Sequence, residues 1–266
     1  SAERVFTLLD TEPEIVDTPA SLETEGDAFA PKKENWAPVQ GEVVFEDVTF
    51  RYGDGPVVLK HFNLHVSPGQ TIALVGQTGS GKSTIVNLLC RFYEPTSGRI
   101  LLDGVDIRAH SQAFLQSHLG YVLQAPHLFS GTIADNIRYG DPTASMERVR
   151  WAAEQVSAAP FIDQLPEGYQ TQVGEGGNRL STGQKQLISF ARALLPDPPL
   201  FVLDEATSSI DTRTELAIQQ AFDEMMRGRT SFIVAHRLST IQKADCILVM
   251  RDGEVIAVSY THLTLP

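Results

Sequence analysis

Apolar and polar residues alternate along the first well-patterned stretch of the chain, which begins near Gly41. The alternating apolar positions are Val43, Phe45, Val48, Phe50 and Tyr52. A period of two is typical of a β-strand with one buried face. The other strands expected in this half of the chain cover residues 59–66, 71–75 and 99–102. Short strands joined by turns predict an antiparallel β subdomain at the start of the folded region.

Farther along, apolar runs of strand length alternate with segments of helical period. The run 200–203 contains no polar residue, as expected of a strand buried on both faces. The expected helices cover 83–92, 145–158, 161–165, 184–195 and 212 to about 226, and the remaining strands cover 119–123, 231–235, 247–250 and 255–256. This alternation predicts an α/β fold with a largely parallel core sheet covered by helices.

Changes in composition and in apolar periodicity divide the chain into three segments. Residues 1–40 are rich in Glu, Pro, Thr and Asp, and are expected to form the end of a helix followed by a connector. Residues 41–256 are expected to form the globular domain, with a helical subdomain at about 125–195. Residues 257–266 break off abruptly and are expected to be unrelated to the fold, as a cloning or assembly scar would be.

The composition narrows the possible partners. Among 266 residues, 21 Lys and Arg stand against 33 Asp and Glu, a formal net charge of −12. Nonspecific binding to nucleic acid is therefore not expected, and a polyanionic ligand needs a local site. Cys90 and Cys246 form neither a disulfide framework nor a clustered metal site, which fits a reducing compartment. No apolar run reaches the roughly 18 residues of a membrane span, so the chain as given is expected to be soluble.

The strongest chemical signal is the glycine-rich segment between the strand at 71–75 and the helix at 83–92. It consists of Gly76, Gln77, Thr78, Gly79, Ser80, Gly81, Lys82, Ser83 and Thr84, and it fits the P-loop pattern. Glycines let backbone N–H groups turn toward phosphates, while Lys82 supplies a point charge and the Ser83 hydroxyl can bind Mg²⁺. An ordinary glycine turn is the alternative, which the flanking strand and helix oppose. The segment predicts a nucleotide site.

Two acidic residues follow the buried strand at 200–203. Asp204 stands at the strand end, where an acidic side chain commonly gives Mg²⁺ a second protein contact. Glu205 is placed to orient or deprotonate an attacking water as a general base. A solvated strand end is the alternative for an isolated Asp-Glu pair, but downstream of a P-loop the catalytic interpretation is favoured.

The residues that follow indicate the class of NTPase. The segment 180–184, Leu-Ser-Thr-Gly-Gln, resembles the signature motif of ATP-binding-cassette (ABC) proteins, usually Leu-Ser-Gly-Gly-Gln. A serine at a helix start is independently suited to anions, although alone it would be a capping turn. The resemblance implies that Ser181, Thr182, Gly183 and Gln184 of one subunit cover the ATP held by another. Thr182 stands where the family has glycine, so the activity of that composite site stays open.

Four more features fall where the ABC family has them. By this resemblance, Tyr52 stacks on adenine, and Gln124 contacts Mg²⁺ and the attacking water in the Q-loop. Residues 208–211 resemble the D-loop, and His236 resembles the switch histidine that contacts the γ-phosphate. Taken alone, Tyr52 would be strand packing, Gln124 a surface residue and His236 a structural histidine.

Two stretches resemble ABC exporters in particular, of the multidrug or lipid half-transporter type. Residues 171–177 resemble the X-loop, which touches the intracellular helices of the membrane domain. Residues 4–15 resemble the segment that follows the last membrane helix. The resemblance covers about residues 1–256. It implies ATP and Mg²⁺ as ligands, a transmembrane domain in the same full-length chain, a second nucleotide-binding domain docked head to tail, and a place at the cytoplasmic face of the cell membrane.

Other functions stay open from the sequence. A soluble cassette protein of DNA repair or translation would usually carry coiled coils or duplicated cassettes, and neither appears; the acidic balance also opposes binding to nucleic acid. A regulatory cassette that binds ATP without hydrolysing it is opposed by Glu205 and His236 but left open by Thr182. Multidrug, lipid and peptide export, and homodimeric or heterodimeric assembly, are all compatible with the chain.

Overall fold

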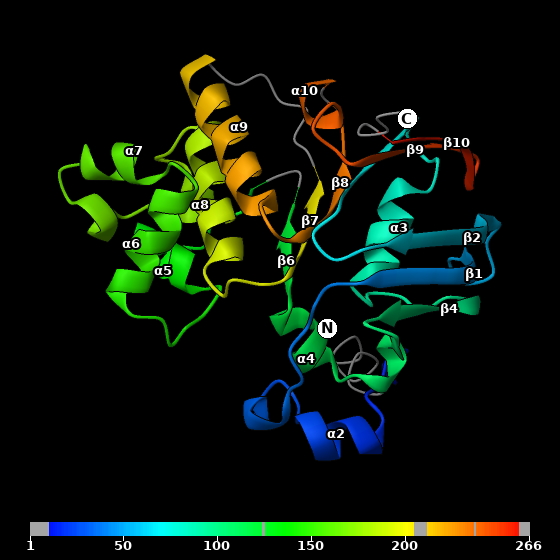
Figure 1. Cartoon of the computed structure of the whole chain (residues 1–266). Helices are drawn as coiled ribbons and strands as arrows, with labels where there is room; N and C mark the ends of the chain where they lie inside the picture. The colour runs from blue at the N-terminus through cyan, green and yellow to red at the C-terminus, as the bar shows by residue number, and fades with distance from the viewer. Residues whose placement is uncertain (1–10, 124–125, 205–211, 237, 261–266) are drawn as a thin grey trace.

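Two β-sheets and a lobe of helices make up the protein in a computed structural model, which describes residues 11–123, 126–204, 212–236 and 238–260. Within these ranges one sheet has the strand order β2-β1-β4-β5 and the other the order β10-β9-β3-β8-β7-β6. Figure 1 shows the first sheet on one side of the molecule and the helical lobe on the other, with the second sheet between them. The second sheet therefore forms the core.

The first sheet is antiparallel throughout, and this confirms the antiparallel β subdomain. Its strands are β1 (Val43–Arg51), β2 (Val57–Val66), β4 (Ser97–Leu102) and β5 (Val105–Asp106). Along β1 the apolar side chains of Val43, Phe45 and Val48 are buried, in keeping with the alternating sequence. Phe45 faces Leu64 of β2 and Ile100 of β4, so the buried face continues across the sheet.

The second sheet is parallel except at one edge. Its strands are β3 (Thr71–Gly76), β6 (Leu119–Val122), β7 (Leu200–Asp204), β8 (Thr230–Val234), β9 (Cys246–Arg251) and β10 (Glu254–Tyr260). Only β10 runs antiparallel to its neighbour β9 among these described strands. The largely parallel core sheet predicted from the sequence is thereby confirmed.

The last strand is longer than the sequence predicted. The hairpin was expected to end at 256, with residues beyond it outside the fold, but β10 continues to Tyr260. Residues 257–260 pair with β9, from Ala257 opposite Val249 to Tyr260 opposite Cys246. A paired edge needs only backbone N–H and C=O groups, so a strand can lengthen without a matching side-chain pattern. The origin of residues 257–266 as a scar stays a prediction.

Strand β7 is buried on both faces, as its uninterrupted apolar run predicts. Phe201 and Leu203 pack into the core of the helical lobe, whereas Leu200 and Val202 pack toward the antiparallel sheet. Helix α3 (Lys82–Leu89) fills the space between the two sheets with three of its buried side chains, Ile85, Val86 and Leu88. The start of α3 is thus anchored to the core from two sides.

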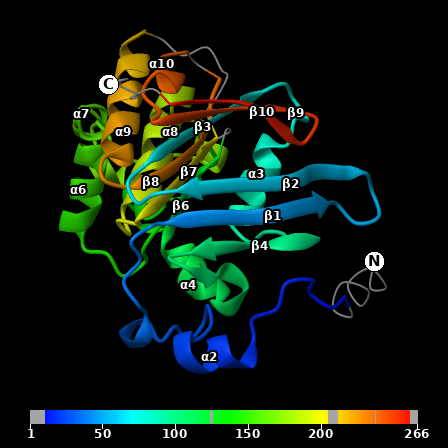
Figure 2. The same ribbon diagram turned by 45° about the vertical axis from the view of Figure 1, so that its right-hand side comes forward.

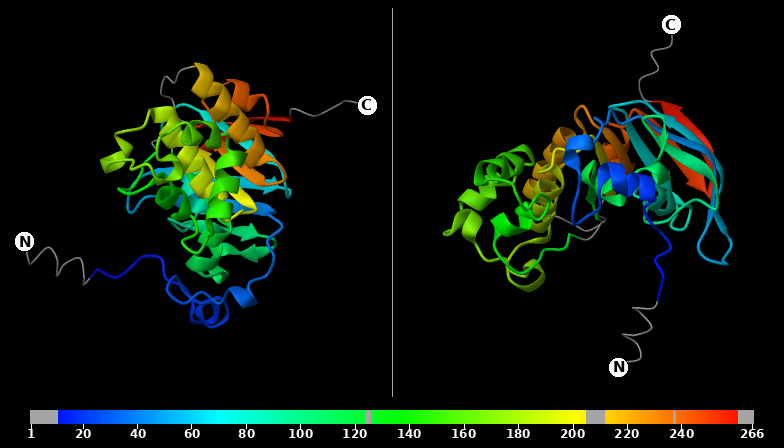
Figure 3. Two further views of the ribbon diagram at one scale, coloured as in Figure 1. Left: turned by 90° about the vertical axis from the view of Figure 1, so that its left-hand side faces the viewer. Right: turned by 90° about the horizontal axis from the view of Figure 1, so that it is seen from below.

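A group of helices forms the lobe predicted as a helical subdomain, which Figure 3 shows well separated from the antiparallel sheet. Its members are α5 (Ile133–Arg138), α6 (Met146–Gln155), α7 (Ala159–Asp163), η3 (Gly168–Gln170), η4 (Glu175–Gly177) and α8 (Thr182–Leu194). Helix α9 (Thr212–Met226) packs against α8, with the rings of Phe190 and Phe222 5.1 Å apart. Helix α5 was not predicted, although Thr132 and Asp135 form a capping box at its start.

The connector is folded, which the sequence did not predict. It contains α2 (Pro19–Glu25) and η1 (Lys33–Asn35), and the Thr18 hydroxyl caps α2 by accepting a hydrogen bond from the Ser21 N–H at 3.1 Å. Trp36 donates its indole N–H to the Glu25 carbonyl oxygen at 2.9 Å. Figure 2 shows α2 lying below α4 (Gln112–Ser117). The capping pair Thr-Pro was visible in the sequence, but the contacts that hold the helix are distant along the chain.

Two short elements complete the described structure, η2 (Ile107–Ala109) and α10 (Leu238–Ile241). No helix in the described part of the chain is both long enough and apolar enough to cross a membrane.

We expect the helical lobe to lose about 3–5 kcal/mol of unfolding free energy when Phe222 becomes Ala, because that ring is fully buried against Phe190. Leu216 lies on the same helix with 61% of its surface exposed, so Leu216→Ala is the matched control and should change stability by about 0.5 kcal/mol or less. Urea unfolding followed by circular dichroism measures both. Equal losses in the two variants would show that α9 is not packed as described.

Candidate functional site

The glycine-rich loop joins the end of β3 to the start of α3. Gly76 has φ 157°, and a side chain there would collide with the Met250 carbonyl oxygen and lie 2.7 Å from the Ser80 hydroxyl. Gly81 caps α3 with φ 103°, a left-handed conformation that favours glycine. The loop therefore closes tightly over the helix start, and this geometry explains why glycines are needed at these two positions.

Lys82 is folded back into this loop. Its ammonium donates to the carbonyl oxygens of Gly76 at 2.7 Å and Gln77 at 2.8 Å, and to the Ser80 hydroxyl at 3.3 Å. Only 6% of the residue is exposed. Burial lowers the pKa of Lys82, and the nearby Asp204 carboxylate partly offsets this effect. A polyanion bound at the loop would supply the opposite charge that a buried ammonium lacks.

A cavity of about 330 Å³ lies above the loop. It is lined by Tyr52, Val58, Thr78, Gly79, Gly81, Lys82, Ser83, Thr84, Asp204, Val234 and His236. These residues come from the antiparallel sheet, the glycine-rich loop and the ends of β7 and β8. The structure thus brings together residues that the sequence singled out more than 150 positions apart, from Tyr52 to His236.

Asp204 ends β7 next to β8, where it pairs in register with Val234. Burial raises the pKa of the Asp204 carboxyl, while His236 and Lys82 act in the opposite direction. A cation close to this carboxyl would favour its ionised form further. His236 follows β8 and is exposed at the rim of the cavity.

The oxygen donors in the cavity suit a magnesium ion. Ser83 and Asp204 both line it, and Mg²⁺ is typically bound by one or two protein oxygens together with phosphate oxygens and water. Within the described residues no group of three or more His, Cys, Asp and Glu could hold a metal ion alone. Ser83 and Asp204 therefore fit a magnesium ion that also takes phosphate oxygens and water as ligands.

Tyr52 follows β1 at the edge of the cavity. Its hydroxyl lies 3.1 Å from the Thr84 hydroxyl, and its ring meets the ring of Phe50 edge-on at 4.7 Å and that of Tyr93 edge-on at 5.0 Å. Tyr52 therefore packs against two aromatic rings and also lines the cavity, and its stacking on adenine stays a prediction. Tyr93 was missed by the sequence analysis, since its position after α3 carries no local signal.

Several predicted residues fall outside the described ranges. They are Gln124, Glu205 and the D-loop segment 208–211. Their catalytic and metal-binding roles stay predictions.

The signature segment opens helix α8. The Ser181 hydroxyl accepts from the Gln184 N–H at 3.2 Å, and the Gln184 side-chain oxygen accepts from the Ser181 N–H at 3.0 Å. Thr182 is exposed and has helical backbone geometry, and Gly183 is buried. The threonine that departs from the family pattern therefore fits the helix without backbone strain.

The signature segment and the glycine-rich loop do not meet within one chain. None of residues 181–184 lines the described cavity around Lys82. Figure 1 shows α8 inside the helical lobe, whereas α3 lies beside the antiparallel sheet. Within one chain the signature segment and the glycine-rich loop therefore lie apart.

The predicted X-loop packs against the start of α8. The backbone of Gln172 bridges to Thr132, and Lys185 of α8 donates to the Gly176 carbonyl oxygen at 3.1 Å. A backbone bridge therefore joins the loop to the start of α5, and the Lys185 side chain joins it to the signature helix.

Comparisons with known proteins agree with this arrangement. Residues 59–208 match the sequence profile of the ABC transporter family. An uncharacterized ABC transporter ATP-binding protein of Bacillus subtilis is 50% identical over 256 residues, which cover 96% of this chain and 40% of that protein. A fatty acid ABC transporter ATP-binding/permease protein of Mycobacterium tuberculosis is 52% identical, with 96% and 38% covered. An ATP-dependent lipid A-core flippase of Chromohalobacter salexigens is 49% identical, with 98% and 43% covered.

A solved structure shares the fold as well. The structure of a bacterial Atm1-family ABC exporter with ATP bound superposes with a TM-score of 0.85 and is 40% identical, covering 98% of this chain and 43% of that one. The chain spans about two fifths of the length of these relatives. The chain belongs to the ABC transporter family and corresponds to the ATP-binding, ATP-hydrolysing domain of its exporter-type members.

Proposed function

We propose that this chain powers the export of a substrate across a membrane by hydrolysing ATP. The observation that carries the proposal is the single cavity shared by Lys82, Ser83, Asp204, His236 and Tyr52. The relatives named as ATP-binding/permease protein and flippase are more than twice as long as this chain. We therefore propose a transmembrane domain in the same full-length protein, with this domain at the cytoplasmic face of the cell membrane.

In this proposal the glycine-rich loop binds the phosphates of ATP and Tyr52 stacks on its base. Lys82 leaves its carbonyl partners to face the β- and γ-phosphates, because a phosphate offers the full negative charge that carbonyl dipoles do not. Ser83, Asp204 and Gln124 would hold Mg²⁺, which neutralises charge on the phosphate oxygens.

Hydrolysis then needs one group that accepts a proton from the attacking water and one group that contacts the γ-phosphate. Glu205 takes a proton from the water as the water oxygen bonds to the γ-phosphorus, and the bond to the β,γ-bridging oxygen breaks to release ADP. His236 holds the γ-phosphate at the rim of the cavity. Most of the rate comes from fixed charges and N–H groups rather than from covalent chemistry.

A second nucleotide-binding domain completes the site in this proposal. Since residues 181–184 do not reach the cavity of their own chain, a partner docked head to tail would bring them to the γ-phosphate. The capped start of α8 offers N–H groups and the positive end of a 13-residue helix. The loops at Gln124 and at 171–177 would pass the closure to the transmembrane domain. The net charge of −12 supports the absence of nucleic acid as a partner.

Replacing Lys82 by Ala should weaken the binding of MgATP about tenfold to a hundredfold, because a charge-assisted contact to phosphate is lost. Isothermal calorimetry measures the dissociation constant. Lys243→Ala is the control, since Lys243 is an exposed lysine paired with Asp223, and it should bind as the unmodified chain does. Undiminished binding by the Lys82 variant would contradict the role given to the loop.

Replacing Glu205 by Gln should reduce phosphate release by about a hundredfold or more, because the general base is removed while shape is retained. MgATP should still bind, and a closed dimer should accumulate on size-exclusion chromatography with ATP present. Glu154→Gln, on the exposed side of α6, should hydrolyse ATP normally. Turnover in the Glu205 variant equal to that of this control would rule out the proposed base.

A further inference from the structure

Arg91 is a buried cation outside the nucleotide cavity. Its side chain is 2% exposed, and its backbone has φ 52°, in the left-handed region. The guanidinium donates to a carboxylate oxygen of Glu94 at 3.0 and 3.1 Å and to the His110 carbonyl oxygen at 2.8 Å. It also reaches the connector, at the Val16 carbonyl oxygen and the Asp17 carboxylate, both at 3.3 Å. The full fork of this arginine is thus used to join three segments.

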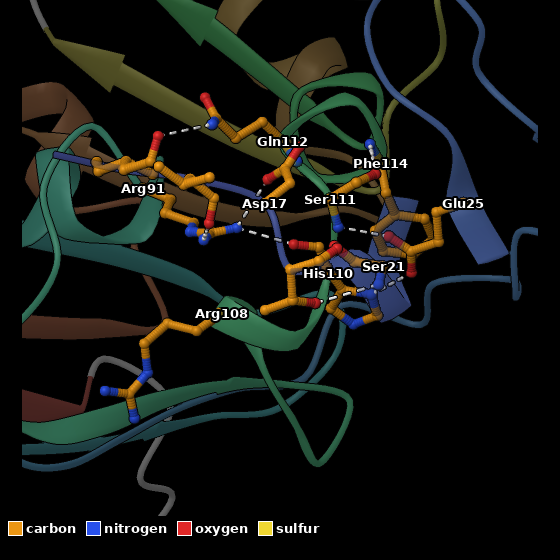
Figure 4. Close-up of polar contacts among 12 residues, drawn as sticks. Asp17, Ser21, Glu25, Arg91, Arg108, His110, Ser111, Gln112 and Phe114 are labelled. Carbon is orange, nitrogen blue, oxygen red and sulfur yellow. Dashed lines mark hydrogen bonds and ion pairs between the residues drawn. The ribbon is translucent and has the colours of Figure 1, made fainter. Parts of the chain in front are cut away.

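The connector also meets the first turn of α4. The Asp17 oxygen that contacts Arg91 accepts the Gln112 N–H at 3.0 Å. One Glu25 oxygen accepts the Ser111 N–H at 2.5 Å, and the other lies 2.7 Å from the His110 ring nitrogen. Figure 4 shows Asp17 between Arg91 and the start of α4, with Glu25 on the far side of His110. Carboxylates at a helix start are favourable, so the connector is held by charge at two points.

The same arginine lies two positions before Tyr93, an aromatic residue at the edge of the nucleotide cavity. Arg91 and Glu94 flank Phe92 and Tyr93 in the chain, and the ring of Tyr93 rests edge-on against that of Tyr52 at 5.0 Å. Glu14 and Ile15 of the connector line a hollow of about 420 Å³ together with Tyr52 and Tyr93. Glu94, the ion-pair partner of Arg91, lines the same hollow, so the connector, this ion pair and the aromatic pair adjoin one another there.

We propose that the ion pairs of Arg91 with Asp17 and Glu94, here called the Arg91 clasp, position Tyr93 behind Tyr52 and thereby set the base side of the nucleotide cavity. Arg91 is a positioning residue in this scheme, since it does not line the cavity itself. The phosphate side is held separately by the contacts of Lys82 within its own loop. The clasp rests on the proposed function, because it assumes that Tyr52 meets the base of ATP.

The base side and the phosphate side of the cavity can be tested separately, because tripolyphosphate has no base. A change that only weakened the fold would reduce the binding of ATP and of tripolyphosphate equally. Asp17→Asn keeps the shape of the side chain but removes the charge that faces Arg91. We expect this variant to bind MgATP about threefold to tenfold more weakly, the range of one lost aromatic contact, and to bind magnesium tripolyphosphate as before. Arg91→Lys, which keeps the charge but loses the fork, should show the same difference between the two ligands. Calorimetry on the 266-residue chain measures both dissociation constants.

Two controls accompany these variants. Glu23→Gln removes an exposed carboxylate from α2 of the connector, and Arg99→Met removes an exposed arginine that pairs with Glu46. Both should bind ATP and tripolyphosphate normally. Thermal unfolding identifies variants that fail to fold. If Arg91→Lys is one of them, the isosteric Asp17→Asn decides the outcome.

Linkage supplies a second measurement on the unmodified chain. If the clasp strengthens ATP binding, ATP must strengthen the clasp by the same factor. The Gln112 N–H that donates to Asp17 reports its closure, and its hydrogen exchange should slow by about threefold to tenfold more with saturating ATP than with saturating tripolyphosphate.

Three results would overturn the proposal. The first is unchanged ATP affinity in folded Asp17→Asn, and the second is an equal loss for ATP and tripolyphosphate, which would place the effect on the whole fold. The third is equal protection of the Gln112 N–H by both ligands. Absence of ATP binding by the unmodified chain would instead overturn the proposed function, and the clasp with it.

Discussion

The capture of the Lys82 ammonium by the carbonyls of Gly76 and Gln77 is the interaction on which the site depends. An ammonium that is nearly removed from water is costly unless other groups replace its hydration. Two carbonyl dipoles and one hydroxyl do so here, and they can only converge because glycine lets the loop turn back over the start of α3. Burial still lowers the pKa of Lys82, and the Asp204 carboxylate offsets only part of this effect. A phosphate supplies the missing negative charge, so the loop geometry that gathers these dipoles around Lys82 also suits a polyanion.

The order of strands decides what stands around that loop. Because β3 lies between β9 and β8, and β7 follows β8, the carboxyl ends of four parallel strands meet at one edge of the sheet. Asp204 and His236 reach the cavity for this reason, although each is remote from Lys82 in the sequence. Phe201 and Leu203 on one face of β7, and Leu200 and Val202 on the other, fix that strand against both cores, so Asp204 sits on a rigid support.

The sequence predicted those parts of the molecule whose signals are local. The period of β1, the apolar run of β7 and the glycine-rich loop each specify their own structure, because the determining residues are neighbours. Contacts between distant segments cannot be read from the local sequence. The partners of Asp17 and Glu25 lie more than 70 positions away, at Arg91 and at residues 110–112, and the connector therefore looked like a linker. Tyr93 and Arg91 were missed for the same reason, since α3 must end where it does before either faces Tyr52 or Asp17. Strand β10 is a different case, because backbone pairing with β9 extends it beyond the residues whose side-chain pattern predicted a strand.

The separation of α8 from the glycine-rich loop explains why the proposed dimer would close with ATP and open after hydrolysis. Two chains that each carry a net charge of −12 gain nothing from long-range attraction, and ATP adds further negative charge between them. In the proposed dimer, contact between the chains would depend on short-range donors, because charges are screened over about 8 Å at physiological ionic strength. The start of α8 supplies such donors, with Ser181 and Gln184 already holding the helix end in shape and Thr182 pointing outward without strain. ATP would thus join two surfaces that otherwise repel, and loss of its γ-phosphate would remove the only anion that those helix ends share. In the proposed cycle, the repulsion between the two chains would then favour their separation after hydrolysis.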